Sequence, residues 1–268
     1  MRDRIILLET STSLCSVALA EEGRIVAARE SDTPRAHASM TAVFVQEILQ
    51  ERGLKVSDCD AVCLSMGPGS YTGLRVGSST AKGLCFGGGI PLLAVSTLDV
   101  LVAQALEEGL PDGCSHIVPM IDARRMEVYS ALYSADGQQL SVVAPQVADE
   151  NFLSQILRSG DCPSGGVASR PLPEGPLPLM EPRVATSAGE TVPATKDTSG
   201  ILFIGDGAGK CEAVLGGERR WFRQECPRAT SMLKPALREL KAGSFRDTAY
   251  FEPFYLKDFV ATVSKKLF

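Results

Sequence analysis

The sequence has 268 residues, of which 44% are hydrophobic and 22% charged, and its formal net charge is −5. Such a chain can bury a core without disulfides or a structural metal, and its acidity argues against nucleic-acid binding driven by its own charge. Its most apolar stretch, 90–106, is interrupted by Pro91, Asp99 and Gln104 and is too broken to span a membrane. The first residues lack the apolar core of a signal peptide, so the cytoplasm is the expected location.

The first third of the chain is predicted to form three strands and then to alternate between helices and strands. Glu21-Glu22-Gly23 is a tight turn between two of the strands, which indicates a hairpin. One helix has apolar residues at helical spacing and ends at Gly53, and a later one begins after a cap at Ser96 or Thr97. The strands are expected at 5–8, 15–20, 24–29, 61–66 and 92–95, and the helices at 36–52, 71–86 and 97–108.

The rest of the chain repeats these patterns around one unusual segment. Strands are expected at 117–121, 127–133, 139–143 and 201–204, and helices at 152–157 and 231–241. Residues 159–200 hold seven prolines, six glycines, five serines and no aromatic residue, which predicts a largely disordered surface insertion or a proline-rich docking segment. Arg219, Arg220 and Arg223 are interpreted as a solvated helix face, with an RNA contact as the alternative.

The most distinctive motif is the glycine-rich run 67–77, which leads from a buried strand into a helix. Gly73, Gly77 and Ala81 are spaced at i, i+4 and i+8, so they form a flat stripe of small residues along that helix. Either this chain's own elements or a partner's helix could lie against the stripe, and spacing alone leaves both open. The run lacks the Lys-Ser/Thr pair of a P-loop, and Ser70 lacks the flanking glycines of a catalytic serine.

Two further turns carry residues that could bind a ligand. Run 205–210 follows a strand and is rich in glycine, but it matches neither the P-loop nor the dinucleotide motif, so it predicts a plain turn or a site for a nucleotide's sugar or phosphate. Run 122–125 (Asp-Ala-Arg-Arg) predicts an ion-paired hairpin or a phosphate contact. With only two histidines and no Cys-x-x-Cys, no zinc centre is expected, and the eight cysteines are expected to stay unpaired.

In combination these motifs resemble the bacterial TsaB (YeaZ) family, a subunit of tRNA threonylcarbamoyladenosine biosynthesis. The resemblance covers roughly the first 135 residues and resumes near residue 200, whereas the proline-rich insertion lies outside the usual family pattern. The matching segments are 6–12, 15–18, 37–39, 67–77, 81–84, 90–92, 121–125 with 127–129, and 205–207.

The resemblance implies an actin-like α/β fold (the sugar kinase, Hsp70 and actin superfamily) with two lobes, each a mixed five-stranded sheet with helices. The expected lobes are 1–108 and 109–268, with the C-terminal helix able to pack back on the first lobe. It implies a non-catalytic subunit that supports the catalytic paralogue TsaD when TsaD transfers threonylcarbamoyl to N6 of adenosine 37 in tRNAs reading ANN codons. A TsaE-like ATPase is a further implied partner, and tRNA is expected to bind only within the complex. The chain alone is expected to form a homodimer, and no association with membranes is expected.

No catalytic or metal-binding residue is expected, because TsaD-like enzymes hold a metal with His-x-x-x-His and here His37 is followed by Thr41. The resemblance places a partner interface on the helices 36–52 and 71–86. Its residues are Met40, Val43, Phe44, Gly73, Val76, Gly77, Thr80 and Ala81. It also places a vestigial nucleotide cleft between the lobes, at Glu9, Thr10, Ser11, Gly205, Asp206 and Gly207.

No cofactor is required in this interpretation, with weak binding of ATP or ADP in the cleft left open. Two other functions stay open as well. One is a phosphotransferase or metallopeptidase that acts alone on the same fold, and the other is a self-sufficient tRNA-binding protein, which the acidic charge opposes.

Overall fold

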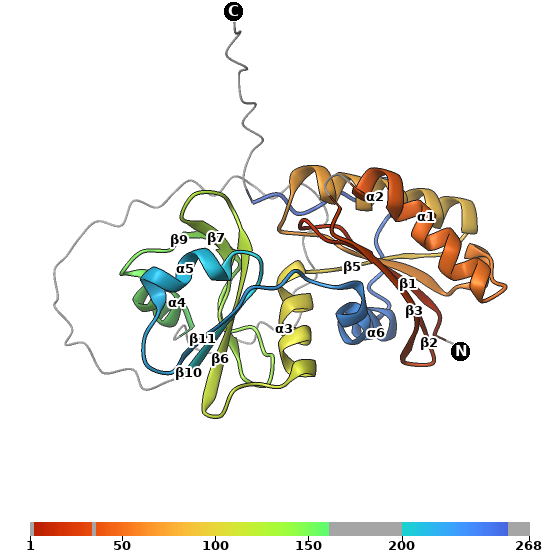
Figure 1. Ribbon diagram of the computed structural model, residues 1–268. Coiled ribbons are helices and arrows are strands. Elements are labelled where there is room, and N and C mark those ends of the chain that lie inside the picture. The colour runs from red at the N-terminus through yellow and green to blue at the C-terminus, as the bar shows by residue number, and fades with distance from the viewer. Residues whose placement is uncertain (1–2, 34–35, 161–199, 257–268) are drawn as a thin grey trace, which may run out of the picture.

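The computed structural model describes residues 3–33, 36–160 and 200–256, which form two lobes, each built on one sheet with helices on both faces (Figure 1). The prediction of a disordered insertion at 159–200 falls almost wholly outside the described residues. Within the part of the chain that the structure describes, no helix is long and apolar enough to cross a membrane.

The first lobe contains a five-stranded mixed sheet in the order β3-β2-β1-β4-β5. Its strands are β1 (Ile5–Glu9), β2 (Cys15–Glu21), β3 (Arg24–Ser31), β4 (Ala61–Ser65) and β5 (Leu92–Val95). Strand β1 pairs antiparallel with β2 and parallel with β4, which itself pairs parallel with β5. Every residue of β1 and β4 is buried, as expected for central strands covered on both faces. The strands and helices predicted for this lobe are confirmed.

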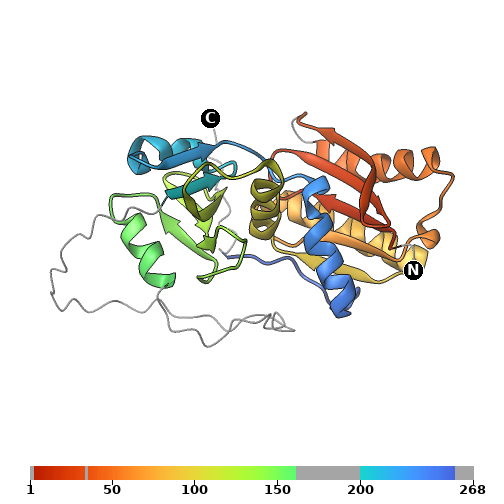
Figure 2. The same ribbon diagram turned by 90° about the horizontal axis from the view of Figure 1, so that it is seen from below.

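Helices cover both faces of the first sheet. On one face lie α1 (Ala36–Glu51) and α2 (Tyr71–Gly88), and on the other lies α6 (Leu233–Ala242), preceded by a 3-10 helix at Ala229–Met232 (Figure 2). Alternate residues of β1 therefore enter two different cores, because Ile6 packs with α1 and α2 whereas Ile5 packs with α6. A second 3-10 helix, Val56–Asp58, precedes β4.

The second lobe has a sheet of strand order β11-β10-β6-β7-β9, with β8 paired to β6. Its strands are β6 (Cys114–Asp122), β7 (Glu127–Ser130), β8 (Tyr133–Ser134), β9 (Ala144–Val147), β10 (Gly200–Ile204) and β11 (Arg220–Arg223). Helices α4 (Phe152–Gly160) and α5 (Ala208–Leu215) cover one face, and α3 (Thr97–Glu108) covers the other, between the two sheets (Figure 1). The two-lobed α/β architecture expected from the sequence is confirmed, but the second sheet has six strands where five were expected, because β8 also pairs with β6.

Two predictions for the second lobe are wrong. Residues 139–143 are no strand, because the partner of β7 is Ala144–Val147 and the intervening residues form the connection. Residues 219–223 are no helix face either, since Arg220–Arg223 pairs parallel with β10 as an edge strand. Both errors come from tertiary pairing that overrides a weak local pattern.

One carboxylate joins elements of both lobes. Asp99 on α3 accepts hydrogen bonds from the Tyr133 hydroxyl at 2.8 Å and from Arg238 Nη2 on α6 at 3.0 Å. Burial raises the pKa of Tyr133 well above its usual value, so its phenol stays protonated as a donor. These contacts connect the second sheet to the helix that covers the first.

Candidate functional site

A cleft of about 1100 Å³ opens between the lobes. The first lobe contributes the N-terminal ends of α1 and α2 and the loop after β1, and the second contributes the β6–β7 turn. Among the residues lining it are Thr12, Ser13, His37, Ser70, Tyr71, Thr72, Val76, Asp122, Arg124, Arg125, Tyr129, Asp206, Phe254 and Tyr255. Of the six residues predicted for a nucleotide cleft, only Asp206 lines it.

The glycine-rich turn into α2 is closed by the chain's own loop after β1. The Ser70 amide donates to the Ser11 carbonyl oxygen at 2.6 Å, and a Cβ at Gly69 would overlap that same oxygen. The Ser70 hydroxyl caps α2 by accepting from the Gly73 amide at 3.3 Å. These glycines are required because two backbone segments approach closely.

The small-residue stripe of α2 faces the interior of the first lobe. A Cβ at Gly73 would overlap the Thr10 carbonyl oxygen, and one at Gly77 would overlap the Thr10 hydroxyl, which donates to the Gly73 carbonyl oxygen at 2.9 Å. Ala81 is fully buried in the first core, as is nearly all of Phe44. The prediction that Gly73, Gly77, Ala81 and Phe44 contact a partner is therefore corrected, because the chain's own residues cover them.

The other predicted interface residues are accessible to differing extents. Val43 is 39% exposed, and Met40, Val76 and Thr80 are half-buried. Around them the exposed positions of α1 and α2 are largely small and uncharged, and include Ala38, Ser39, Ala42, Thr72, Ser79 and Gly83. An interface on this outer face stays a prediction.

The loop predicted to bind nucleotide directs its polar groups inward. Glu9 is fully buried, and its Oε1 accepts from the Ser11 amide at 2.7 Å. Burial raises the pKa of Glu9 to about 7, although hydrogen bonding from Ser11 opposes the shift. The Thr10 hydroxyl bonds to the Gly73 carbonyl oxygen, and the Ser11 carbonyl oxygen bonds to the Ser70 amide. Neither of these two groups is therefore available to a ligand in the cleft.

The second glycine turn is also packed against its own lobe. The Gly205 and Gly207 amides donate to the carbonyl oxygens of Arg223 and Met120, each at 3.0 Å. Gly205 has φ +137°, and a Cβ there would overlap the Met120 carbonyl oxygen. Between the plain turn and the phosphate site left open by the sequence, this geometry favours the turn.

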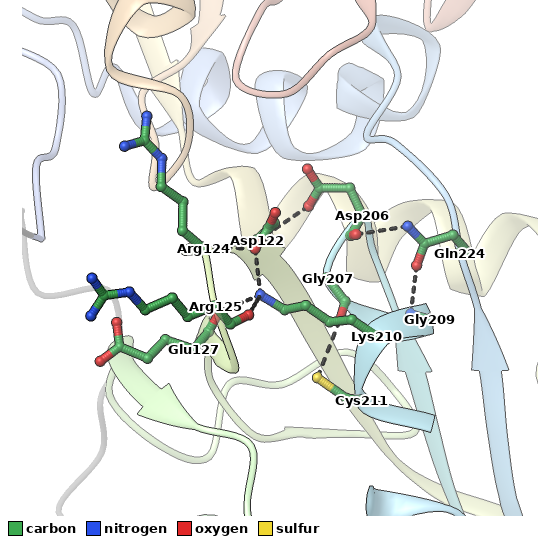
Figure 3. Close-up of polar contacts among 10 residues, drawn as sticks. All are labelled: Asp122, Arg124, Arg125, Glu127, Asp206, Gly207, Gly209, Lys210, Cys211 and Gln224. Carbon is green, nitrogen blue, oxygen red and sulfur yellow. Dashed lines mark hydrogen bonds and ion pairs between the residues drawn. The ribbon is translucent and has the colours of Figure 1, made fainter. Parts of the chain in front are cut away.

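Asp206 and Lys210, in the second glycine-rich run, bond to the β6–β7 turn (Figure 3). Asp206 Oδ1 accepts from the Asp122 amide at 2.9 Å, and burial raises the pKa of Asp206 to about 6. Lys210 Nζ donates to the Asp122 carboxylate and to the carbonyl oxygens of Arg125 and Glu127, at 2.8 and 2.7 Å. The role of Lys210 was not predicted, because it depends on two segments that are distant in sequence.

The ion pair in this turn differs from the hairpin pairing that the sequence suggested. Asp122 pairs with Lys210 and accepts from the Arg124 backbone amide at 2.8 Å. The guanidinium groups of Arg124 and Arg125 point away from Lys210 (Figure 3), and both residues line the cleft.

Aromatic side chains line the cleft as well, a feature that the sequence analysis missed. The rings of Tyr71 and Tyr255 lie 5.0 Å apart between centroids, and the Arg75 guanidinium lies 4.2 Å from the Tyr71 centroid. The C-terminal segment is anchored there, since the Phe254 amide donates to the Met66 carbonyl oxygen at 2.8 Å. This segment has no periodic pattern of apolar residues that would have predicted its position.

No group of three or more His, Cys, Asp or Glu side chains that could hold a metal occurs among residues 3–33, 36–160 and 200–256. His37 Nε2 lies 3.3 Å from the Leu14 carbonyl oxygen. Thr41, where a second histidine of a helical metal pair would stand, is buried and donates its hydroxyl proton to the His37 carbonyl oxygen at 2.6 Å.

Comparisons with known proteins agree on one family. The family model described as TsaD, tRNA N6-adenosine threonylcarbamoyltransferase, matches residues 29–207. The tRNA threonylcarbamoyladenosine biosynthesis protein TsaB of Escherichia coli (strain K12) is 35% identical over 56% of this chain and 66% of its own length. An uncharacterized protein of Mycobacterium tuberculosis (strain ATCC 25618 / H37Rv) is 31% identical over 66% of this chain and 89% of its own length.

A solved structure described as YeaZ from Pseudomonas aeruginosa superimposes with a TM-score of 0.69 at 26% identity, covering 95% of this chain and all of that one. The predicted α/β fold with two lobes is confirmed, and it is the fold of this YeaZ structure. In sequence, the chain spans between 51% and 66% of the length of the TsaB relatives from Escherichia coli, Haemophilus influenzae and Bacillus subtilis.

Proposed function

The chain belongs to the TsaB (YeaZ) family of TsaD-like proteins, and we propose that it is a non-catalytic subunit that pairs with a TsaD-like paralogue in tRNA threonylcarbamoyladenosine biosynthesis. The TsaD-like partner would transfer threonylcarbamoyl to N6 of adenosine 37. This chain would hold that partner in its active arrangement, with a TsaE-like ATPase as a third component.

The observation that carries the non-catalytic role is the state of Thr41. A helical His-x-x-x-His metal pair needs a second imidazole at this position, and the hydroxyl there is buried and bonded to the helix backbone. In the two loops that could have served a nucleotide, the amides of Ser11, Gly205 and Gly207 bond within their own lobe instead. Together these contacts support a subunit that acts through its surface.

The outer face of α1 and α2 supports pairing with a partner of similar fold. From Ala36 to Gln46 α1 contains no Asp, Glu, Lys or Arg, and its Val43 is 39% exposed. Low charge and small side chains suit close helix–helix packing, whereas solvated helix faces carry alternating charges. Val43, Met40, Val76 and Thr80 are the residues we expect to contact the partner.

The direct test is a reconstituted modification reaction. The TsaD-like and TsaE-like proteins of the source organism are incubated with ATP, threonylcarbamoyl-AMP and tRNA, with and without this chain, so that transfer of the threonylcarbamoyl group releases AMP. Modified adenosine is measured by mass spectrometry of the digested tRNA. We expect modification only when this chain is present, and none from this chain alone. Phosphoryl transfer from ATP or peptide cleavage by the isolated chain would instead support the phosphotransferase or metallopeptidase alternative.

Val43→Asp tests the interface. Because the charge would have to be desolvated between helices, we expect association with the TsaD-like protein to weaken by roughly ten-fold or more. Val142→Asp is the matched control, since Val142 is 74% exposed on the second lobe. Both variants should keep the wild-type thermal midpoint, and equal association of the two by size-exclusion chromatography would contradict the proposed interface.

A further inference from the structure

Arg124 and Arg125 line the cleft. Neither guanidinium group has an ion pair or hydrogen bond with any residue that the structure describes (Figure 3). Two arginines elsewhere in this acidic chain are ion-paired, Arg4 with Glu21 and Arg228 with Glu30. Two adjacent guanidinium groups that line a concave site without an ion pair do not stabilise the fold through their charge. They are suited to binding an anionic ligand.

The backbone of the Arg124–Arg125 turn is strained, and Lys210 bonds to it. Arg124 and Arg125 have φ +68° and +52°, in the left-handed region that residues with a side chain rarely adopt. Lys210 offsets this strain by donating hydrogen bonds to three acceptors, two of which are the Arg125 and Glu127 carbonyl oxygens. Its charge is therefore used within the turn, and the two arginines are left to face a ligand.

The other lobe contributes features that fit the same ligand. The N-terminal end of the 18-residue helix α2 enters the cleft at Tyr71 and Thr72, where the helix dipole favours a negative charge. Tyr71, Tyr129 and Tyr255 also line the cleft, and Tyr71 packs against Tyr255, so the arginines lie in a site with an aromatic lining. Aromatic rings near arginines are typical of sites for single-stranded nucleic acid.

We propose that the Arg124–Arg125 turn binds the phosphate backbone of an RNA strand that lies in the interlobe cleft. This inference rests on the proposed function, because it assigns to this chain a contact with the tRNA that the complex modifies. The acidic chain needs only a local contact, since its partner would supply the remaining basic surface.

The same site is poorly built for a free nucleoside polyphosphate. The Gly205 and Gly207 amides, which would have to cradle phosphates, bond to Arg223 and Met120. The exposed arginines at the rim favour a phosphodiester that passes through the site.

The test uses the reconstituted complex with three double variants of this chain. R124N/R125N removes both charges while keeping a residue type that tolerates positive φ. R124K/R125K keeps the charges. R24Q/R158Q is the control that removes two charges at exposed arginines outside the cleft. Binding of labelled tRNA is followed by fluorescence anisotropy between 50 and 200 mM salt.

For R124N/R125N we expect about ten-fold weaker binding at low salt and a salt dependence, d log K/d log[salt], reduced in magnitude by about 1.4 to 1.8, as for two lost phosphate contacts. R124K/R125K and R24Q/R158Q should retain the wild-type slope. An R124N/R125N slope equal to the control's would overturn the inference. So would arginine-dependent binding of AMP or ADP, measured by calorimetry, with no change in tRNA binding.

Size-exclusion chromatography with the TsaD-like partner separates this inference from the proposed function. We expect R124N/R125N to assemble like the wild type and to lose only tRNA affinity. If the wild-type chain neither assembles nor supports modification, the proposed function fails. If it does both and the tRNA salt slope is insensitive to the arginines, only the RNA contact fails.

Discussion

The two lobes each contain a glycine-rich turn between a buried strand and a helix, and the two turns are closed in different ways. The turn into α2 is closed by backbone groups and hydroxyls of the first lobe, with the Ser70 amide on Ser11 and the Thr10 hydroxyl on Gly73. The turn into α5 is surrounded by charged and amide side chains, since Asp206 bonds to the Asp122 amide and Gln224 to the Asp206 carbonyl oxygen.

The first turn holds its own lobe together, whereas the second also positions residues that line the cleft. In both turns a glycine is present because a carbonyl oxygen lies where a Cβ would stand, that of Ser11 at Gly69 and that of Met120 at Gly205. Only the second turn also holds a lysine, Lys210, which fixes a pair of arginines at the rim of the cleft. Glycine-rich motifs of the same appearance therefore serve packing in one lobe and site construction in the other.

Gly73→Ala should give the largest effect. The added methyl group would overlap the Thr10 carbonyl oxygen, and the better helix propensity of alanine does not offset that clash. We expect a loss of roughly 3 kcal/mol or more in the free energy of unfolding, measured with urea. Gly83→Ala on the same helix is the control, because nothing lies within 4 Å of a Cβ there. It should stabilise by about 1 kcal/mol, and similar losses in both variants would contradict the buried stripe.

Glu9→Gln should change the pH dependence of stability. Burial raises the pKa of Glu9 from 4.5 to about 7. The unfolded chain therefore ionises first as pH rises, and the folded state loses stability between about pH 4.5 and pH 7. The variant lacks this loss, so its stability relative to the wild type should rise by up to about 3 kcal/mol between pH 4 and pH 8. If the difference in the free energy of unfolding between variant and wild type were constant with pH, burial would not raise the pKa of Glu9.

Lys210→Met should weaken the second turn alone. The change removes an ammonium group from the Asp122 carboxylate and from two carbonyl oxygens while keeping much of the side-chain volume. Since Lys210 is partly exposed, we expect a loss of about 1–2 kcal/mol in urea unfolding. Binding of tRNA should weaken too, although Lys210 does not face the ligand. Lys234→Met, at an exposed lysine on α6, should change neither quantity.

Ser70→Ala should have the smallest effect. It removes the hydroxyl that caps α2 and should cost about 1 kcal/mol, whereas α5 begins at Gly207 without a side-chain cap. Ser79→Ala, at an exposed position within α2, is the control and should be neutral or slightly stabilising. Equal unfolding midpoints for the two variants would show that the cap does not contribute.

The first lobe was predictable because its local patterns agree with its tertiary structure. Buried strands such as 61–66 are continuous apolar runs, and Gly53 and Ser96 mark helix ends by rules that act over a few residues. The edge strand β11 was missed because its position depends on pairing with β10, and the C-terminal segment at Phe254 because it has no periodicity of its own.

By itself the sequence determined the family, the two-lobed fold and the order of most elements, since motif order and apolar periodicity are local properties of the chain. Only the tertiary structure decided what each motif faces. It turned Gly73, Gly77 and Ala81 toward the chain's own core, and it placed Lys210 beneath the Arg124–Arg125 turn. Spacing specifies which residues share a helix face, whereas the packing of distant segments specifies which neighbour that face meets.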